Sequence, residues 1–237
     1  MTNLKNRGKE ASDDALFGTA KMQSKLKEAV TDMHYFLSRG YGEKSTLTLV
    51  GNHYRLNARQ QQAVRGMSAS EQQIKNRKSK EIQSQDLEGK EICIDGFNAL
   101  ILLESTLSNA YVFKGQDGFI RDLSSVYGTY KKVNQTSQAI EIITGFFRNE
   151  KIKKAVWLFD KPVSNSGKLK QMIEEVALNN NLNWEVQLVN NPDKVIAESD
   201  YIAITSDAWI LDNASANFNL MKYVLAQIDA KETVIDL

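Results

Sequence analysis

The sequence predicts an α/β protein in which a small all-α domain precedes a mostly parallel sheet flanked by helices. From Glu91 onward, short apolar runs alternate with amphipathic segments, a pattern typical of strand–helix–strand units and hence of a parallel sheet. Before Glu91 no segment has the pattern of a buried strand. Apolar residues there recur at steps of three and four, as they do on one face of a helix.

The first part is expected to consist of helices separated by turns. Apolar side chains recur at helical spacing between Leu16 and Leu37, and Asn57 and Ser70 are of the types that cap helices. The expected elements are a helix at 13–38, an extended piece at 47–50, a helix at 57–65 and a helix that begins at 70.

In the second part, apolar runs bounded by turn residues predict the strands. Asp117 and Gly118 form a pair that is typical of a tight hairpin turn. The expected strands are 92–95, 112–113, 119–120, 155–160, 184–189 and 201–205, and the expected helices are 98–108, 137–149, 168–178, 192–198 and 218–229. We therefore divide the chain into a loose tail at 1–14, a basic helical domain at 15–82, a polar linker at 83–90 and an α/β domain at 91–237.

Composition excludes several classes of protein. With 42% hydrophobic and 25% charged residues, the chain has the make-up of a globular protein. It has no apolar run long enough for a membrane span, and its first residues are too polar for a signal peptide, so we expect a cytoplasmic protein. The single cysteine, Cys93, lies in an apolar run and is expected to be a buried free thiol.

Charge is distributed unevenly along the chain. Residues 1–90 carry 16 Lys and Arg against 10 Asp and Glu, whereas residues 91–237 carry 14 against 19. A basic segment attracts polyanions such as RNA, and an acidic segment attracts cations. The alternative is that both segments simply have solvated charged surfaces.

Three aspartates, Asp95, Asp160 and Asp207, each follow a predicted strand. Ligands of open α/β sheets bind at the carboxyl ends of the strands, so we expect these acids at one edge of the sheet. Carboxylates are preferred ligands of Mg²⁺ and Mn²⁺, which activate water and stabilise phosphoryl transition states. The alternative for each acid is an ordinary helix cap.

Several other chemistries are excluded by missing motifs. No Gly-x-Gly-x-x-Gly follows a strand, and Leu169 stands where a P-loop has Ser or Thr. Phe97 occupies the position, two residues after Asp95, where haloacid-type phosphatases carry a second aspartate. Both histidines, His34 and His53, fall in the helical part, which argues against a Ser–His–Asp triad. Two histidines and one cysteine also argue against a zinc site.

Three short segments resemble the signature motifs of PIN-like and NYN-type metal-dependent ribonucleases. They are Ile-Asp-Gly-Phe-Asn at 94–98, Pro-Asp-Lys-Val-Ile at 192–196 and Ile-Thr-Ser-Asp at 204–207. The resemblance covers roughly residues 91–212. It implies a PIN-like fold with an Mg²⁺ or Mn²⁺ site.

The same resemblance implies roles for individual residues. Asp95, Asp193 and Asp207 would hold the metal. Asn98 would orient a ligand or a water molecule, and Glu104 would fill the second acidic position of that family. The remaining candidates for completing the acidic site are Asp122, Asp160 and Asp212.

The whole chain is also similar to a prokaryotic family known as domain of unknown function 434. In that family a small helical domain precedes a PIN-like one. The similarity is carried by Leu-Val-Gly-Asn-His-Tyr-Arg-Leu-Asn-Ala-Arg-Gln at 49–60, Asp-Gly-Phe-Ile-Arg-Asp at 117–122 and Asp-Lys-Pro-Val-Ser-Asn-Ser-Gly at 160–167.

Basic residues of the helical domain are candidates for contacts with RNA phosphates. Arg55, Arg59 and Gln62 are expected on one helix face, Lys78 follows on the next helix, and Tyr54 is available to stack on a base. The alternative is a solvated helix face.

A second phosphate-binding segment is expected in the loop after residue 160, because small polar residues there lead into a helix N-terminus. A plain turn is the alternative. The candidate residues of this loop are Ser164, Asn165, Ser166 and Lys168. Further candidates near the hairpin turn are Tyr127, Tyr130 and Lys131.

The expected activity is Mg²⁺- or Mn²⁺-dependent endonucleolytic hydrolysis of RNA, with the metal at the acidic strand ends and the helical domain positioning the strand. Two alternatives stay open. One is a non-catalytic nucleic-acid-binding module of the same fold, and the other is a small nucleotide phosphohydrolase that uses the loop at 164–168. We expect no membrane partner, and the sequence leaves both the substrate RNA and a homo-oligomer open.

Overall fold

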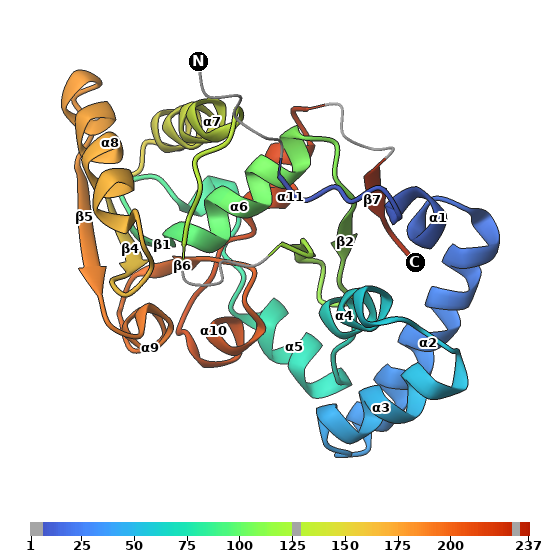
Figure 1. Cartoon of the computed structure of the whole chain (residues 1–237). Helices are drawn as coiled ribbons and strands as arrows, with labels where there is room; N and C mark the ends of the chain where they lie inside the picture. The colour runs from blue at the N-terminus through green and yellow to red at the C-terminus, as the bar shows by residue number, and fades with distance from the viewer. Residues whose placement is uncertain (1–6, 125–128, 229–232) are drawn as a thin grey trace.

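The computed structural model describes residues 7–124, 129–228 and 233–237. A group of helices lies beside the α/β part, on the right of Figure 1, and the chain runs from one part into the other through α5. The helices of the first part are α1 (Asp13–Phe17), α2 (Ala20–Ser38), α3 (Glu43–His53), α4 (Ala58–Met67) and α5 (Glu71–Ser79).

The helix predicted at 13–38 is divided in two. Gly18 ends α1, and the Thr19 side chain begins α2 by accepting a hydrogen bond from the Met22 N–H at 3.3 Å. The predicted extended piece at 47–50 is wrong, because these residues lie within α3. Thr48 is β-branched, but its hydroxyl donates to the Lys44 carbonyl one turn earlier at 2.9 Å, and the Val50 side chain is buried.

The predicted mostly parallel sheet flanked by helices is confirmed. Four parallel strands lie in the order β5-β4-β1-β6, with β1 (Glu91–Asp95) and β4 (Lys154–Asp160) in the centre. The outer strands are β5 (Trp184–Val189) and β6 (Ile202–Ile204). In this register Asp95 lies opposite Leu158, and Ile94 lies opposite Ile204, so the strands end close to one another.

Both faces of this sheet are covered. One face packs against α6 (Gly96–Leu107), α7 (Thr136–Asn149), α8 (Ser166–Asn179) and α11 (Leu220–Leu225) in the largest hydrophobic core. The other face carries Cys93, Val156 and Leu158 and packs against α9 (Pro192–Ala197) and α10 (Ala208–Asn213). Burial on both faces explains why the strands are continuous apolar runs rather than alternating ones.

A second, smaller sheet joins the two parts. Its order is β3 (Ile120–Arg121), β2 (Val112–Lys114) and β7 (Val234–Ile235), with β2 antiparallel to β3. The predicted hairpin turn is present, and Gly118 adopts a φ of +87°, which favours glycine. Phe113 of β2 and Ile235 of β7 pack into the core of the helical part.

The segments outside the predicted domains are also attached to the protein. In the stretch 83–90, which contains the short 3₁₀ helix η1 (Ser84–Asp86), Leu87 is fully buried in the core of the α/β part. In the stretch 7–14, Asp13 is buried and Arg7 forms an ion pair with Glu104 of α6. Among the described residues, no helix is long and apolar enough to cross a membrane.

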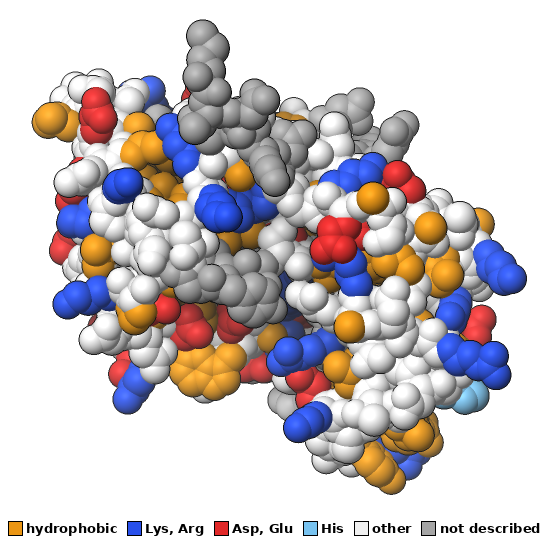
Figure 2. All heavy atoms as spheres, viewed as in Figure 1, with side chains coloured by type: hydrophobic (Ala, Val, Ile, Leu, Met, Phe, Trp, Pro, Cys, Tyr) orange, Lys and Arg blue, Asp and Glu red, His pale blue; other side chains and the backbone are white. Residues whose placement is uncertain are grey.

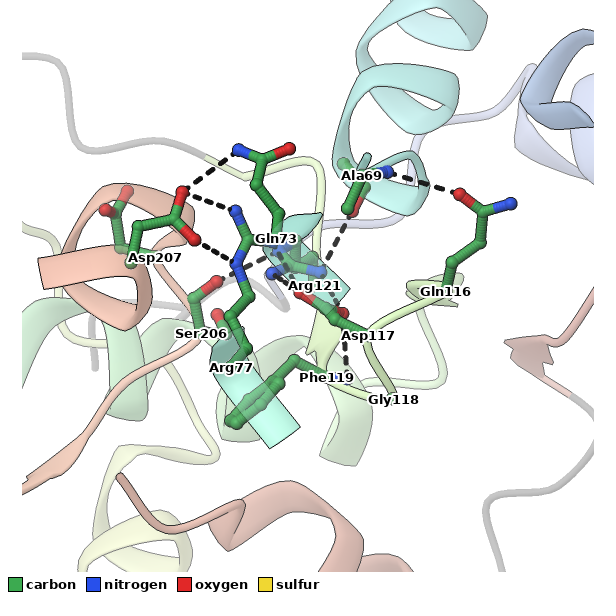
Figure 3. Close-up of polar contacts among 12 residues, drawn as sticks. Ala69, Gln73, Arg77, Gln116, Asp117, Gly118, Phe119, Arg121, Ser206 and Asp207 are labelled. Atoms are coloured by element: carbon green, nitrogen blue, oxygen red, sulfur yellow. Dashed lines mark hydrogen bonds and ion pairs between the residues drawn. The ribbon is translucent and has the colours of Figure 1, made fainter. Parts of the chain in front are cut away.

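A buried ion-pair network connects α5 to the α/β part. Arg77 of α5 is 2% exposed and donates to Asp117 of the hairpin turn at 2.7 Å and to Asp212 of α10 at 2.6 Å. Figure 3 shows Arg77 and Arg121 converging on Asp117. Although burial works in the opposite direction, Arg121 and Arg77 hold the pKa of Asp117 below its ordinary value. The helical part is therefore fixed against the sheet.

We predict that Arg77→Ala lowers the free energy of unfolding by about 3 kcal/mol, because it removes a buried cation from Asp117, which keeps only Arg121, and leaves Asp212 without its ion-pair partner. Urea unfolding followed by circular dichroism measures the loss. The matched control is Lys78→Ala, since Lys78 is exposed on the same helix, and it should change stability by less than about 0.5 kcal/mol. Equal effects of the two substitutions would contradict the role of the network.

Candidate functional site

The carboxyl edge of the four-stranded sheet collects acidic side chains. Asp95 ends β1 and Asp160 ends β4. Asp207 follows β6 as the N-cap of α10, and Asp193 lies in the first turn of α9, directly after β5. Helix α9 contacts both β1 and β4 as well as α10. Asp193, in the first turn of this helix, therefore lies near the centre of the edge.

Asp95 is buried, with 8% of its surface exposed. One of its carboxylate oxygens accepts a hydrogen bond from the Thr205 hydroxyl at 2.9 Å, and the other caps α6 by accepting the Asn98 N–H at 3.4 Å. Gly96 allows the close turn, because a Cβ there would lie 2.3 Å from the Phe159 ring. Asp95, which the sequence predicts as a metal ligand, is therefore also the N-cap of α6.

Asn98 is held in one orientation by the segment after β6. Its Oδ1 accepts hydrogen bonds from the Ser206 N–H at 2.8 Å and from the Ser206 hydroxyl at 3.0 Å. Because the backbone N–H can only donate, the oxygen of the amide must face Ser206, and Nδ2 must face away. Among the described residues Nδ2 has no hydrogen-bond partner, so this donor is available to a ligand.

Asp207 combines capping with a free oxygen. Its Oδ1 accepts the N–H groups of Trp209 and Ile210 at 2.8 and 3.1 Å, as expected of a helix N-cap. Within the described part of the chain, Oδ2 accepts no hydrogen bond. Oδ1 of Asp207 thus caps α10, while Oδ2 is available to a cation.

The acids at this edge act on one another electrostatically. Burial raises the pKa of Asp95 from 3.8 to about 7; the hydrogen bond from Thr205 opposes this shift, and the charges of Asp193 and Asp207 add to it. Burial also raises the pKa of Asp193, as do the charges of Asp207 and Asp160. The charged groups acting most on Asp95 and Asp193 are thus other carboxylates, with no lysine or arginine among them.

These carboxylates are neighbours without forming a closed coordination shell. Among the described residues, no three His, Cys, Asp or Glu side chains are placed so that they could hold one metal ion. Cys93, which lies two residues before Asp95, packs in the hydrophobic core between the sheet and α9 and α10, where burial raises the pKa of its thiol to about 12. The donors at this edge are therefore carboxylate, amide and hydroxyl groups, which suit hard cations rather than zinc.

Glu104 does not lie with the strand-end acids. It is six residues beyond Asn98 on α6, about 9 Å further along the helix axis. Its side chain is fully buried. It accepts hydrogen bonds from the Tyr130 and Thr136 hydroxyls and forms an ion pair with Arg7. The structure gives Glu104 a structural role, anchoring the N-terminal segment, in place of the second acidic position implied by the family resemblance.

Two further candidate acids have structural partners. Asp212 pairs with Arg77 in the network that joins the two parts. Asp122 accepts a hydrogen bond from the Ser105 hydroxyl at 3.2 Å, and burial raises its pKa to about 7. Asp193 and Asp207 are the carboxylates whose charges act on Asp95, and Asp160 acts in turn on Asp193, whereas Asp122 lines the same cleft as Asp207.

The residues of the helical part that were predicted to contact nucleic acid do not form one exposed surface. Arg59 turns inward, where it pairs with Asp13 at 2.6 Å and donates to the Gly8 carbonyl at 2.9 Å. Tyr54 donates its hydroxyl to Asp32 at 2.8 Å and is partly buried against the core of the helical part. Arg55 and Lys78 are exposed, but neither lies beside the acidic edge.

The loop after β4 is partly used by the fold itself. The Asn165 side chain donates to the Tyr130 carbonyl at 2.9 Å, and the Ser164 carbonyl accepts the Tyr130 N–H at 3.0 Å. Ser166 is buried at the start of α8, while Lys168 is exposed in the first turn of this helix. Of the other residues singled out nearby, Lys131 is exposed and Tyr127 lies outside the described residues.

The sequence did not predict a cleft that lies beside Asp207, the one of the four strand-end acids that lines it. It has a volume of about 550 Å³ and lies between the helical part and the ends of β1 and β6. Asn98, Ser206 and Asp207 line it from the α/β part, and residues of the α2–α3 turn and of α4 line it from the other side. Gln62, which the helical spacing placed beside Arg59, is one of these residues.

Comparisons with known proteins agree with the two-part organisation. A family model described as "Domain of unknown function (DUF5616)" matches residues 84–223, and one described as "Protein of unknown function (DUF434)" matches residues 25–80. The predicted relation to domain of unknown function 434 is thus confirmed for the helical part. Uncharacterized protein MJ0935 of Methanocaldococcus jannaschii is 32% identical over 193 residues, which cover 81% of this chain and 92% of that protein. No solved structure matches the chain significantly.

We predict that Asp95→Asn stabilises the metal-free protein in a pH-dependent way. Because the folded state raises the pKa of Asp95 from 3.8 to about 7, the wild-type protein loses stability as the pH rises between these values. Asparagine carries no charge; its Oδ1 can accept the Asn98 N–H, and its NH₂ group can donate to the Thr205 hydroxyl, which can rotate to accept. The margin between variant and wild type should therefore grow from near zero at pH 4 to at most about 4 kcal/mol at pH 8.

The measurement is urea unfolding at a series of pH values in the presence of EDTA. Asp200→Asn is the matched control, because Asp200 is an exposed acid close to β6, and its margin over the wild type should not change with pH. Parallel stability curves for Asp95→Asn and the wild type would show that the Asp95 carboxylate is not strained by burial.

Proposed function

Since the chain belongs to the family described as Domain of unknown function (DUF5616), whose model spans its α/β part, we propose an activity from the site itself. This activity is hydrolysis of RNA phosphodiester bonds with Mg²⁺ or Mn²⁺ held at the carboxyl edge of the sheet. The observation that carries the proposal is the burial of Asp95, with other carboxylates and no cation among the described charged groups that act most on it. Repulsion between the carboxylates and the desolvation of their charge make such an arrangement unfavourable, and a bound divalent cation offsets both effects.

The donor chemistry fits a hard cation. Mg²⁺ commonly binds through one or two carboxylates and keeps several of its water molecules, so a site need not contain three direct protein ligands. Asp95 and the free Oδ2 of Asp207 are the ligands best supported, because both come from segments adjoining β1 and β6, which are paired. Asp193 and Asp160 would then act through water molecules or as second ligands.

Other residues of the edge would position the substrate. A bound Mg²⁺ or Mn²⁺ supplies an activated water and stabilises the charge that develops on the phosphate. Thr205 fixes the orientation of the Asp95 carboxylate, and Ser206 fixes that of Asn98. The Nδ2 of Asn98 is then aimed away from the protein's own acceptors and is suited to donate to a phosphodiester oxygen.

The resemblance of segments 94–98, 192–196 and 204–207 to PIN-like ribonucleases supports the same activity. Asp95, Asp193 and Asp207 occupy the positions that this resemblance implies as metal ligands. The α/β part would accordingly be a PIN-like domain, preceded by the helical part as a module that positions RNA. A non-catalytic RNA-binding module of the same fold predicts binding without metal-dependent cleavage.

A nucleotide phosphohydrolase is the second candidate, and one observation favours it. The loop at 164–168 follows Asp160 at the acidic edge, and α8 begins there without a side-chain cap, with Lys168 exposed. Backbone N–H groups at such a helix start can bind a phosphate. Under this alternative, mononucleotides rather than RNA should raise the melting temperature of the protein.

We predict that Asp95→Asn lowers Mn²⁺-dependent cleavage of a mixed RNA pool by at least about 100-fold, because the group best placed to hold the metal is lost. Gel analysis of end-labelled RNA measures the rate. Mn²⁺ should also raise the melting temperature of the wild type more than that of the variant. The control is Asp200→Asn, which should cleave at the wild-type rate, and wild-type cleavage by Asp95→Asn would refute the proposal.

A further inference from the structure

We propose that the cleft between the helical part and the acidic edge binds single-stranded RNA, with Tyr41 stacking on a base and Arg65 contacting a phosphate. This inference rests on the proposed function, since it assigns the path of the same substrate. It moves the RNA-binding role of the helical part away from Arg55, Arg59 and Lys78 to a different set of residues.

The cleft has the right location for a substrate path. Its volume of about 550 Å³ falls within the range of roughly 300–1,000 Å³ that is usual for ligand sites. Asp207 and Asn98 lie in one wall, and Tyr41, Gln62 and Arg65 lie in the opposite wall. A strand lying in this cleft would pass the acidic edge while touching both parts of the chain.

Tyr41 is suited to stacking. It lies on the turn between α2 and α3 and is 59% exposed, which is unusual for an aromatic side chain of a folded protein. The Phe36 ring packs against it in a T-shaped arrangement, with ring centroids 5.4 Å apart at an angle of 73°, so the orientation of Tyr41 is restricted although more than half of its surface is exposed. Stacking on such a ring tolerates any base.

Arg65 is the cation of the cleft that is most easily recruited. Its described partner is Glu43 at 2.6 Å, and both side chains are more than half exposed. Such a surface pair contributes little to stability, so a phosphate can replace the carboxylate. Arg77 and Arg121 also line the cleft, but their guanidinium groups are engaged with Asp117.

The two walls are held at a fixed separation. Arg121 donates to the Ser206 carbonyl at 2.9 Å and to the Gly66 carbonyl of α4 at 3.0 Å, which bridges the α/β part to the helical part. A preformed cleft costs less to occupy than one that must open. Figure 2 shows basic and acidic side chains close together where the two parts meet, so affinity there depends on specific contacts rather than on a uniform positive field.

Single-stranded RNA is the ligand that fits these features together. It brings phosphates for Arg65 and Asn98 and an unstacked base for Tyr41, whereas the bases of a duplex are already stacked on each other. A mononucleotide offers the same chemistry but spans only a part of the cleft. We therefore expect a short single strand to bind more tightly than either a duplex or AMP.

The test is fluorescence anisotropy with a 5′-labelled octanucleotide RNA and the full-length chain in EDTA, where no metal-dependent cleavage occurs. Tyr41→Ala and Arg65→Gln should each weaken binding about tenfold. The matched controls are Tyr35→Ala and Lys78→Gln, which remove an exposed tyrosine and an exposed cation outside the cleft, and they should stay within about twofold of the wild type.

Equal effects of cleft and control substitutions, or no preference of the wild type for a single strand over duplex RNA and AMP, would overturn the inference. Hydrolysis of bis(p-nitrophenyl) phosphate by the wild type with Mn²⁺ tests the proposed function separately, since this diester has no base. If the wild type hydrolyses neither this diester nor RNA, but the cleft substitutions still weaken RNA binding selectively, the cleft stands as an RNA site and only the catalytic proposal fails.

Discussion

The parallel register of the four-stranded sheet is the constraint on which the rest of the protein depends. Because β1, β4, β5 and β6 run in the same direction, all four end at one edge, and the acidic residues that follow them are brought together. Asp95 is at the centre of this edge, buried, and the charged groups that act most on it in the described part of the chain are other carboxylates. Its hydrogen bonds to Thr205 and to the start of α6 hold it in place in spite of the unfavourable desolvation of its charge.

A second set of charged residues attaches the helical part to the α/β part. Arg77 and Arg121 both pair with Asp117, and Arg77 also pairs with Asp212, so two positive charges meet two negative ones in a largely buried network. The contrast with Asp95 is informative. Where the protein needs rigidity, buried charges are paired, and where we propose chemistry, a buried charge is left unpaired. The rigid attachment also defines the cleft beside Asp207.

Much of the fold could be predicted from sequence because its signals are local. Strand ends are visible as apolar runs that stop at a polar residue, and the parallel-sheet rule then places Asp95 and Asp207 at one edge. Contacts between distant segments leave no such signal. The pairing of Glu104 with Arg7 joins residues 97 positions apart, so the spacing along α6 could not distinguish a metal ligand from a buried anchor. The cleft lining at Tyr41 was missed for the same reason, since it depends on how α2 and α3 pack against α4 and α5.

The central claim is that Asp95 is a buried carboxylate whose charge becomes favourable when a divalent cation is present. Carbon-13 NMR of labelled aspartate side chains, titrated with and without Mg²⁺, tests it most directly, with Asp95→Asn identifying the resonance. We predict a pKa of about 7 for Asp95 without metal and a pKa lowered by at least about one unit with Mg²⁺, since a nearby cation favours the charged form. An ordinary pKa near 3.8 that does not respond to Mg²⁺ would contradict the account.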